Sequence, residues 1–170
     1  MAKKTTTTTK NEIERFHAWL ATEDPLSIAT HVYVDADAVF SAALLSVLKP
    51  KAQVVFVSAD CEIGDSRTLA VDLSKGERAI KGLDVGSAFG LLVLGMKSID
   101  HPIYCALQKW ATQLNLTDSG KGCRDALVLA QLVKAWRSLG MGDKGCFKRA
   151  KELIEGKIKS ERSDIKQKEL

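Results

Sequence analysis

The chain has 170 residues, of which 45% are hydrophobic, and this length and composition are typical of one globular domain. Its longest mainly apolar run, residues 86–96, is far shorter than the roughly 20 residues that span a bilayer, so we expect no membrane role. The formal net charge of +4 permits contact with phosphates, but it does not by itself indicate a nucleic-acid-binding protein.

Residues 1–10 are polar and basic, and we interpret them as a flexible tail rather than a secretory signal because no apolar segment follows. None of the four cysteines forms a C-x-x-C pair, which argues against structural zinc and a disulfide framework. We therefore expect a cytoplasmic protein with a single domain over residues 11–156. Residues 157–170 alternate charged and polar side chains and are predicted to be a solvated end.

The first half of the chain alternates helical and strand patterns. Apolar residues at helical spacing predict an amphipathic helix over residues 11–21. A mostly apolar segment predicts a buried strand over residues 27–34, followed by an apolar helix over residues 38–48 that stops before Pro50. Further buried strands are predicted at residues 53–58 and 69–72, and this order indicates a parallel sheet.

The second half is predicted to be mainly helical, with helices over residues 87–97, 102–114, 124–139 and 143–159. Trp110 and Trp136 fall on apolar helical faces and are interpreted as core residues. The sequence thus predicts an α/β fold whose parallel sheet carries helices on both faces and is followed by a mainly helical C-terminal half.

An imidazole and two carboxylates, His31, Asp35 and Asp37, lie where the first strand enters its helix. If the extended conformation persists through Asp37, these side chains point to one side and offer one nitrogen and two oxygens to a divalent cation. The structural alternative makes Asp37 a helix N-cap, Asp35 a turn residue and His31 a hydrogen-bonded core residue. The combination favours a functional site, because adjacent carboxylates beside an apolar strand repel unless a cation or donors neutralise them.

Three segments match the motifs of a known family in order along the chain. Residues 31–42 read H-x-x-x-D-x-D-A-x-x-S-A, Asp72 ends a later predicted strand, and Asp118 lies in the sequence T-D-S-G that is followed by Arg124. These segments resemble the first, second and fourth motifs of the DHH phosphoesterase superfamily. That superfamily includes RecJ-type exonucleases and phosphodiesterases of short oligonucleotides and cyclic dinucleotides.

The resemblance implies a metal-dependent phosphodiesterase that acts on a small nucleotide or a short oligonucleotide. It implies that His31 and Asp35 bind a first cation, that Asp37 and Asp118 bind a second, and that Asp72 bridges the two. A set rich in carboxylates favours Mn²⁺ or Mg²⁺ over zinc, because hard oxygen donors select hard cations. The expected partners are a phosphate-containing small molecule or a short nucleic acid, and a homodimer is one expected assembly.

The third motif of the family, Asp-His-His, is absent from the chain. Asp84 stands near its expected place, and we predict it as a catalytic substitute beside Asp72, although a further carboxylate faces an anionic substrate unfavourably. Substrate contacts are assigned to Ser87, Arg124 and Lys81. Two functions therefore stay open, a phosphohydrolase with weakened activity and a non-catalytic DHH-like domain that binds protein or nucleic acid.

Overall fold

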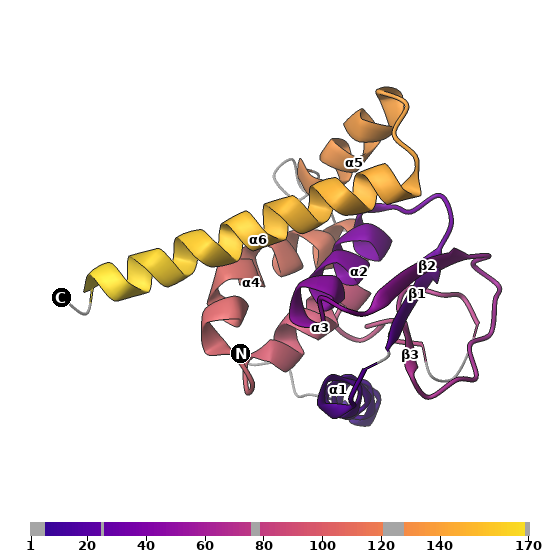
Figure 1. Ribbon diagram of the computed structural model, residues 1–170, viewed down its shortest axis with the longest axis horizontal. Coiled ribbons are helices and arrows are strands. Elements are labelled where there is room, and N and C mark those ends of the chain that lie inside the picture. The colour runs from indigo at the N-terminus through magenta and orange to yellow at the C-terminus, as the bar shows by residue number, and fades with distance from the viewer. Residues whose placement is uncertain (1–5, 25, 76–78, 121–127, 169–170) are drawn as a thin grey trace.

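A computed structural model of the protein describes residues 6–24, 26–75, 79–120 and 128–168. This part of the chain contains three short strands and six helices (Figure 1). The strands are β1 (Ser27–His31), β2 (Gln53–Val57) and β3 (Thr68–Ala70), and the helices are α1 (Thr7–Ala21), α2 (Ala36–Leu48), α3 (Ala88–Met96), α4 (His101–Asp118), α5 (Val128–Ser138) and α6 (Asp143–Lys168). The predicted α/β class is therefore confirmed.

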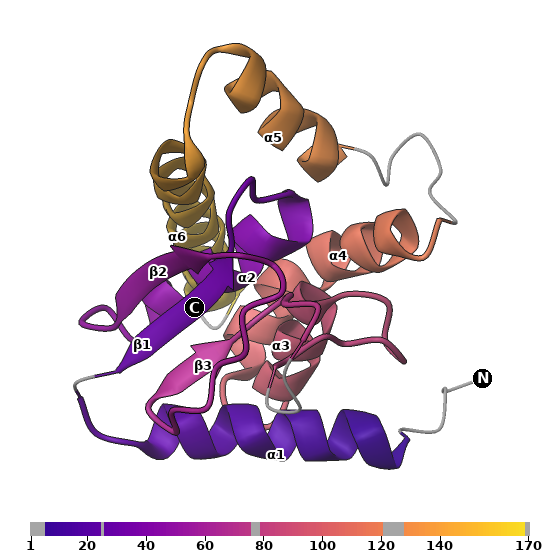
Figure 2. The same cartoon turned by 90° about the vertical axis from the view of Figure 1, so that its right-hand side faces the viewer.

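The three strands form one parallel sheet in the order β2-β1-β3, with β1 in the centre (Figure 2). β1 pairs with β2 along its whole length, from Ser27 to His31. A parallel bridge between Val71 and Ile80 continues the β3 side of the sheet. Because the strands run the same way, their carboxyl ends meet at one edge, where ligands collect in open parallel sheets. The predicted parallel sheet is confirmed.

The main core lies between one face of the sheet and the helices. Helix α2 is buried nearly all round, as its apolar composition predicts. The ring of Phe40 in α2 contacts the rings of Phe89, Trp110 and Trp136, which come from α3, α4 and α5. Both tryptophans therefore pack against the core, as predicted.

The prediction of helices on both faces of the sheet is wrong for the described residues. The helices lie on one face, with α1 along the β3 edge (Figures 1 and 2). The β2–β3 connection, residues 58–67, is shorter than the dozen or so residues that a helical crossover needs. Non-helical segments cover the other face through a small apolar cluster made of Val57, Ile63, Ala70, Leu73 and Ala79.

Helix α1 begins at Thr7 and so includes part of the predicted flexible tail over residues 1–10. Its N-cap is Thr6, whose hydroxyl oxygen accepts a hydrogen bond from the amide of Thr9 at 3.2 Å. Near the other end of the helix, the indole N–H of Trp19 donates to the carbonyl of Arg67 at 3.1 Å. This bond fixes α1 beside the start of β3.

The C-terminal half is mainly helical, as predicted, but its boundaries differ. Helix α4 continues to Asp118, because nothing breaks the helix before Gly120. The predicted start of the next helix at residue 124 lies outside the described residues. Helix α6 continues to Lys168, so the described part of the predicted solvated end is helical; an ion pair between Lys157 and Glu161, one helical turn apart, supports it.

Measured by length and apolarity together, none of the described helices is suited to cross a membrane.

Candidate metal centre

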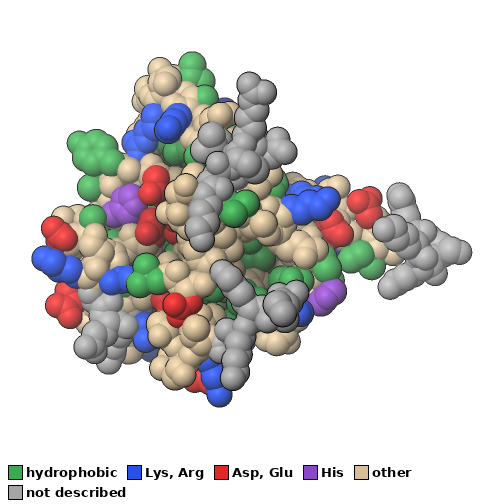
Figure 3. Space-filling view, turned by 180° about the vertical axis from the view of Figure 1, so that it is seen from behind, with side chains coloured by type: hydrophobic (Ala, Val, Ile, Leu, Met, Phe, Trp, Pro, Cys, Tyr) green, Lys and Arg blue, Asp and Glu red, His purple; other side chains and the backbone are tan. Residues whose placement is uncertain are grey.

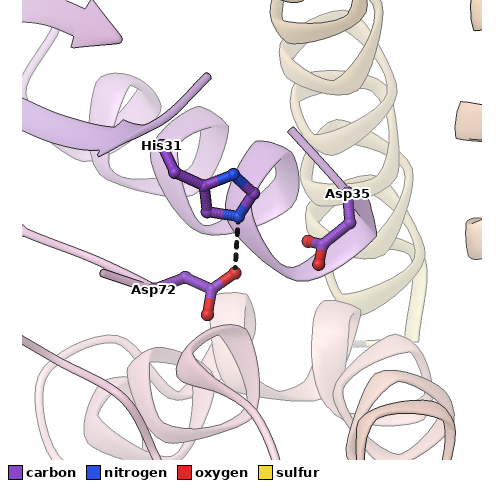
Figure 4. A group of neighbouring side chains, drawn as sticks. All are labelled: His31, Asp35 and Asp72. Carbon is purple, nitrogen blue, oxygen red and sulfur yellow. Dashed lines mark hydrogen bonds and ion pairs between the residues drawn. The ribbon is translucent and has the colours of Figure 1, made fainter. Parts of the chain in front are cut away.

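Three side chains that can ligate a metal converge beyond the carboxyl ends of β1 and β3. His31 is the last residue of β1, Asp72 follows β3 and Asp35 precedes α2. One ligand atom from each of these residues lies within 4.8 Å of the other two. The imidazole Nε2 of His31 lies 3.2 Å from Oδ2 of Asp72, and the Asp35 carboxylate faces the same space (Figure 4).

The backbone between His31 and Asp35 does not remain extended, so the premise for placing three side chains on one side is wrong. β1 ends at His31, and Tyr33 has a positive φ of 56°, which turns the chain away from the strand direction. Asp35 is the N-cap of α2 and accepts a hydrogen bond from the amide of Ala38 at 3.0 Å. The N-cap of α2 is thus Asp35 rather than Asp37. Asp35 lies beside His31 because the chain turns at Tyr33, not because side chains alternate along a strand.

The position of Asp72 also depends on a left-handed backbone. Its φ is 53°, a conformation that aspartate tolerates better than most residues other than glycine. Its amide donates to the carbonyl of Ile80 at 3.0 Å, directly after the bridge between Val71 and Ile80. These bonds hold Asp72 at the sheet edge, opposite His31.

Asp37 is buried in the first turn of α2 and connects it to α3. Its two carboxylate oxygens accept the backbone amides of Ala88 and Phe89, each at 2.7 Å. Burial raises the pKa of Asp37 well above its usual range, and the negative charges of Asp72 and Asp118 raise it further. Both carboxylate oxygens of Asp37 are therefore used to hold the first amides of α3. The charges of Asp72 and Asp118 still act on this carboxyl group.

Asp118 joins the same cluster from the C-terminal end of α4. Partial burial, followed by the charges of Asp35 and Asp72, raises the pKa of the Asp118 carboxyl to about 6, while a hydrogen bond with Asp37 opposes the rise. The structure thus brings Asp118 close to three carboxylates from two other segments of the chain. Among the residues described, all five predicted metal ligands are electrostatically linked, although only His31, Asp35 and Asp72 meet within the range of one cation.

The pKa values of His31 and Asp35 are both raised in this cluster. The hydrogen bond to Asp72 raises the pKa of His31 to about 9 against a smaller opposing effect of burial. The Nδ1 atom of His31 bonds the carbonyl of Val32 at 2.8 Å, which leaves Nε2 directed at Asp72. Desolvation raises the pKa of Asp35 as well, and the negative charge of Asp72 is the next cause.

The cluster forms part of the wall of an open pocket of about 660 Å³. Figure 3 shows a face of the molecule on which acidic side chains lie next to a histidine and hydrophobic side chains border them. Lys81 also lines the pocket, and its ammonium group donates to the carbonyl of Ser74 at 2.7 Å. The backbone amide of Lys81 donates to the buried carboxylate of Glu12 at 2.7 Å, which fixes this wall.

Two predicted site residues lie elsewhere. Asp84 is exposed, accepts a hydrogen bond from the hydroxyl of Thr6, the N-cap of α1, and is not among the described residues that line the pocket, so its catalytic role stays a prediction. A carboxylate is favoured at that position because a helix N-terminus carries partial positive charge. Ser87 is the buried N-cap of α3, and its hydroxyl already bonds Asn115 and the amide of Gly90, so its substrate contact stays a prediction. Arg124 lies outside the described residues.

One ion pair near the site was missed by sequence reasoning. The carboxylate of Asp143, at the start of α6, accepts the backbone amides of Tyr33 at 3.1 Å and Val34 at 3.0 Å. The guanidinium of Arg137 bonds this carboxylate and donates to the carbonyl of Val34 at 3.3 Å. An aspartate after two glycines signals a helix start, but nothing local in the sequence indicates that it reaches the β1–α2 turn.

Comparison of the chain with family models, with curated proteins and with solved structures found no match.

Proposed function

We propose that the protein is a divalent-metal-dependent phosphodiesterase of the DHH type, acting on a small nucleotide or a short oligonucleotide. The observation that carries this proposal is the convergence of Asp72 with His31 and Asp35, which come from a separate segment of the chain. Gathering carboxylates in this way costs free energy, as the raised pKa of Asp35 and of Asp118 indicates. A cost of this kind at a pocket is typical of functional sites.

The donor set fits a hard or borderline cation. His31 offers an imidazole nitrogen, and Asp35 and Asp72 offer carboxylate oxygens, which suits Mn²⁺ or Mg²⁺. When bound, such a cation supplies positive charge that offsets the negative charge developing on a phosphoryl group. We assign Asp37 to holding α3 and Asp118 in place, because both of its oxygens already accept backbone amides.

The protein groups around the cluster have separate roles in this proposal. The bond from Nδ1 to the carbonyl of Val32 orients the His31 ring and leaves Nε2 for the cation. Lys81 is the one lysine in the described lining of the pocket. Its ammonium group supplies positive charge that attracts an anionic phosphate. The pocket, at about 660 Å³, falls within the range of small-molecule sites.

The alternative function is a non-catalytic DHH-like domain that binds protein or nucleic acid. It is favoured by the position of Asp84, which faces α1 instead of the pocket and leaves the missing third motif without a substitute there. Within the described lining of the pocket, His31 is the single histidine. Both functions include a bound cation, but only the phosphodiesterase hydrolyses a substrate.

Calorimetric titration of Mn²⁺ tests the metal centre. We expect Asp35→Asn and Asp72→Asn to weaken binding by at least about tenfold, because each removes a charged ligand. Asparagine keeps the N-cap of α2 at position 35 and tolerates the left-handed backbone at position 72. Asp164→Asn, on the exposed surface of α6, is the matched control and should bind Mn²⁺ like the wild type. Equal binding by all four proteins would remove the metal centre.

Turnover separates the two functions. The protein is incubated with Mn²⁺ and short RNA or DNA oligonucleotides, or with an aryl phosphodiester. Hydrolysis that disappears in Asp72→Asn and persists in Asp164→Asn supports the phosphodiesterase. Tight Mn²⁺ binding without hydrolysis of any of these compounds would instead support the interaction domain.

A further inference from the structure

Two large hydrophobic residues, one in the pocket lining and one in the turn between His31 and Asp35, have exposed side chains. Leu83 lines the pocket and is 77% exposed. Tyr33 is 84% exposed and lies in the turn between the ligands His31 and Asp35. An exposed leucine alone is ordinary, but an almost fully exposed aromatic residue between two metal-ligating residues contributes little to the core.

The backbone of Tyr33 is held in a conformation that costs free energy. Its φ of 56° is unusual for a bulky residue and persists only where surrounding bonds impose it. Those bonds come from Asp143, which accepts the amides of Tyr33 and Val34, and from Arg137, which bonds both Asp143 and the Val34 carbonyl. The protein therefore fixes the turn and keeps the tyrosine ring at the surface.

The backbone of Tyr33 lies close to the candidate ligands, and its exposed ring lies outside the lining of the pocket itself. Consecutive Cα atoms lie about 3.8 Å apart, so the Cα atom of Tyr33 is within about 8 Å of those of His31 and Asp35. A nucleotide whose phosphate lies between the cation and Lys81 extends its base over a comparable distance. Every nucleotide base is planar and stacks favourably on an aromatic ring, whichever of the bases it is.

We propose that Tyr33 is the stacking surface for the base of a nucleotide whose phosphate is bound at the metal centre, with Leu83 as a further apolar contact. This inference rests on the proposed function and adds to it the residue that recognises the base of the nucleotide. It separates nucleotides from sugar phosphates and inorganic phosphates, which present the same anion without a planar group.

The test compares AMP with ribose 5-phosphate by calorimetry in the presence of Mn²⁺. We expect the wild type to bind AMP roughly 5- to 100-fold more tightly, which is the range of one base–aromatic stack. Tyr33→Ala should bind both compounds with the affinity of ribose 5-phosphate, whereas Tyr33→Phe should keep the preference because it keeps the ring. Leu139→Ala removes another exposed side chain, 76% exposed, and should change neither affinity.

Two results would overturn the inference while leaving the metal centre intact. One is equal binding of AMP and ribose 5-phosphate by a wild-type protein that binds Mn²⁺. The other is a preference for AMP that survives in Tyr33→Ala. If Mn²⁺ itself does not bind, the proposed function fails and the inference fails with it, and the separate Mn²⁺ titration identifies that case.

Discussion

Replacement of Asp118 by asparagine should stabilise the metal-free protein near neutral pH. The carboxyl of Asp118 has a pKa raised to about 6, so above that pH the folded state holds a carboxylate it disfavours. The rise from 3.8 to about 6 corresponds to about 3 kcal/mol at about 1.36 kcal/mol per pKa unit, which solvent screening of this exposed residue reduces to about 1 kcal/mol. The asparagine amide can also donate to Asp37 without a proton being taken up.

The assay is urea unfolding followed by tryptophan fluorescence, at pH 7.5 and at pH 5. We expect Asp118→Asn to raise the free energy of unfolding by about 1 kcal/mol at pH 7.5, or the thermal midpoint by about 2–4 °C. The gain should shrink at pH 5, because wild-type Asp118 is then largely protonated in the folded state. Asp164→Asn serves as control. A loss of stability at pH 7.5, or an equal gain at both pH values, would refute the electrostatic reasoning.

Three further outcomes are expected. Asp37→Ala should lower the free energy of unfolding by about 2–4 kcal/mol in urea titrations, because it leaves two buried α3 amides without an acceptor; a change under 1 kcal/mol would contradict this role. Because the pKa of His31 is about 9 and the cation displaces its proton, Mn²⁺ binding at pH 7 should release about one proton. Calorimetry in buffers of different ionisation enthalpy measures this release, and identical heats would disprove it. Gly82→Ala should destabilise the protein, since φ is +61° and a Cβ would lie 1.9 Å from the Ser87 carbonyl oxygen, whereas Gly156→Ala in α6 meets nothing within 4 Å and should stabilise it by about 0.5–1 kcal/mol in thermal unfolding.

The features of the site that depend on strand order could be predicted from the sequence. Nearly continuous apolar strands, with a helix between the first two, predict a parallel sheet, and a parallel sheet brings the end of β1 beside the end of β3. The proximity of His31 and Asp72, 41 residues apart in the chain, therefore follows from topology. The helix boundaries near Asp118 and at Thr7 were less predictable, because tertiary packing extends helices past weak local signals.

The features that could not be predicted are hydrogen bonds between distant segments. Asp37 caps α3 across 51 residues of chain, and Thr6 holds Asp84 across 78. In the sequence, each of these carboxylates could equally well bond a neighbouring residue. Its actual partner depends on where the N-terminus of a distant helix lies in the fold. The left-handed turn at Tyr33 likewise depends on Asp143, which no local pattern connects to it.

The ligands of the candidate metal centre come from two stretches of chain, residues 31–35 and Asp72, that meet only in the folded protein, so an unfolded chain offers no comparable site. Mass action then makes a bound cation a stabiliser of the native state, worth about 2.7 kcal/mol when its free concentration is 100 times the dissociation constant. A thermal melting curve recorded at rising Mn²⁺ concentrations should consequently move upward without saturating. Such a shift reports site affinity without needing a substrate, and it offers a direct way to rank Mn²⁺ against Mg²⁺.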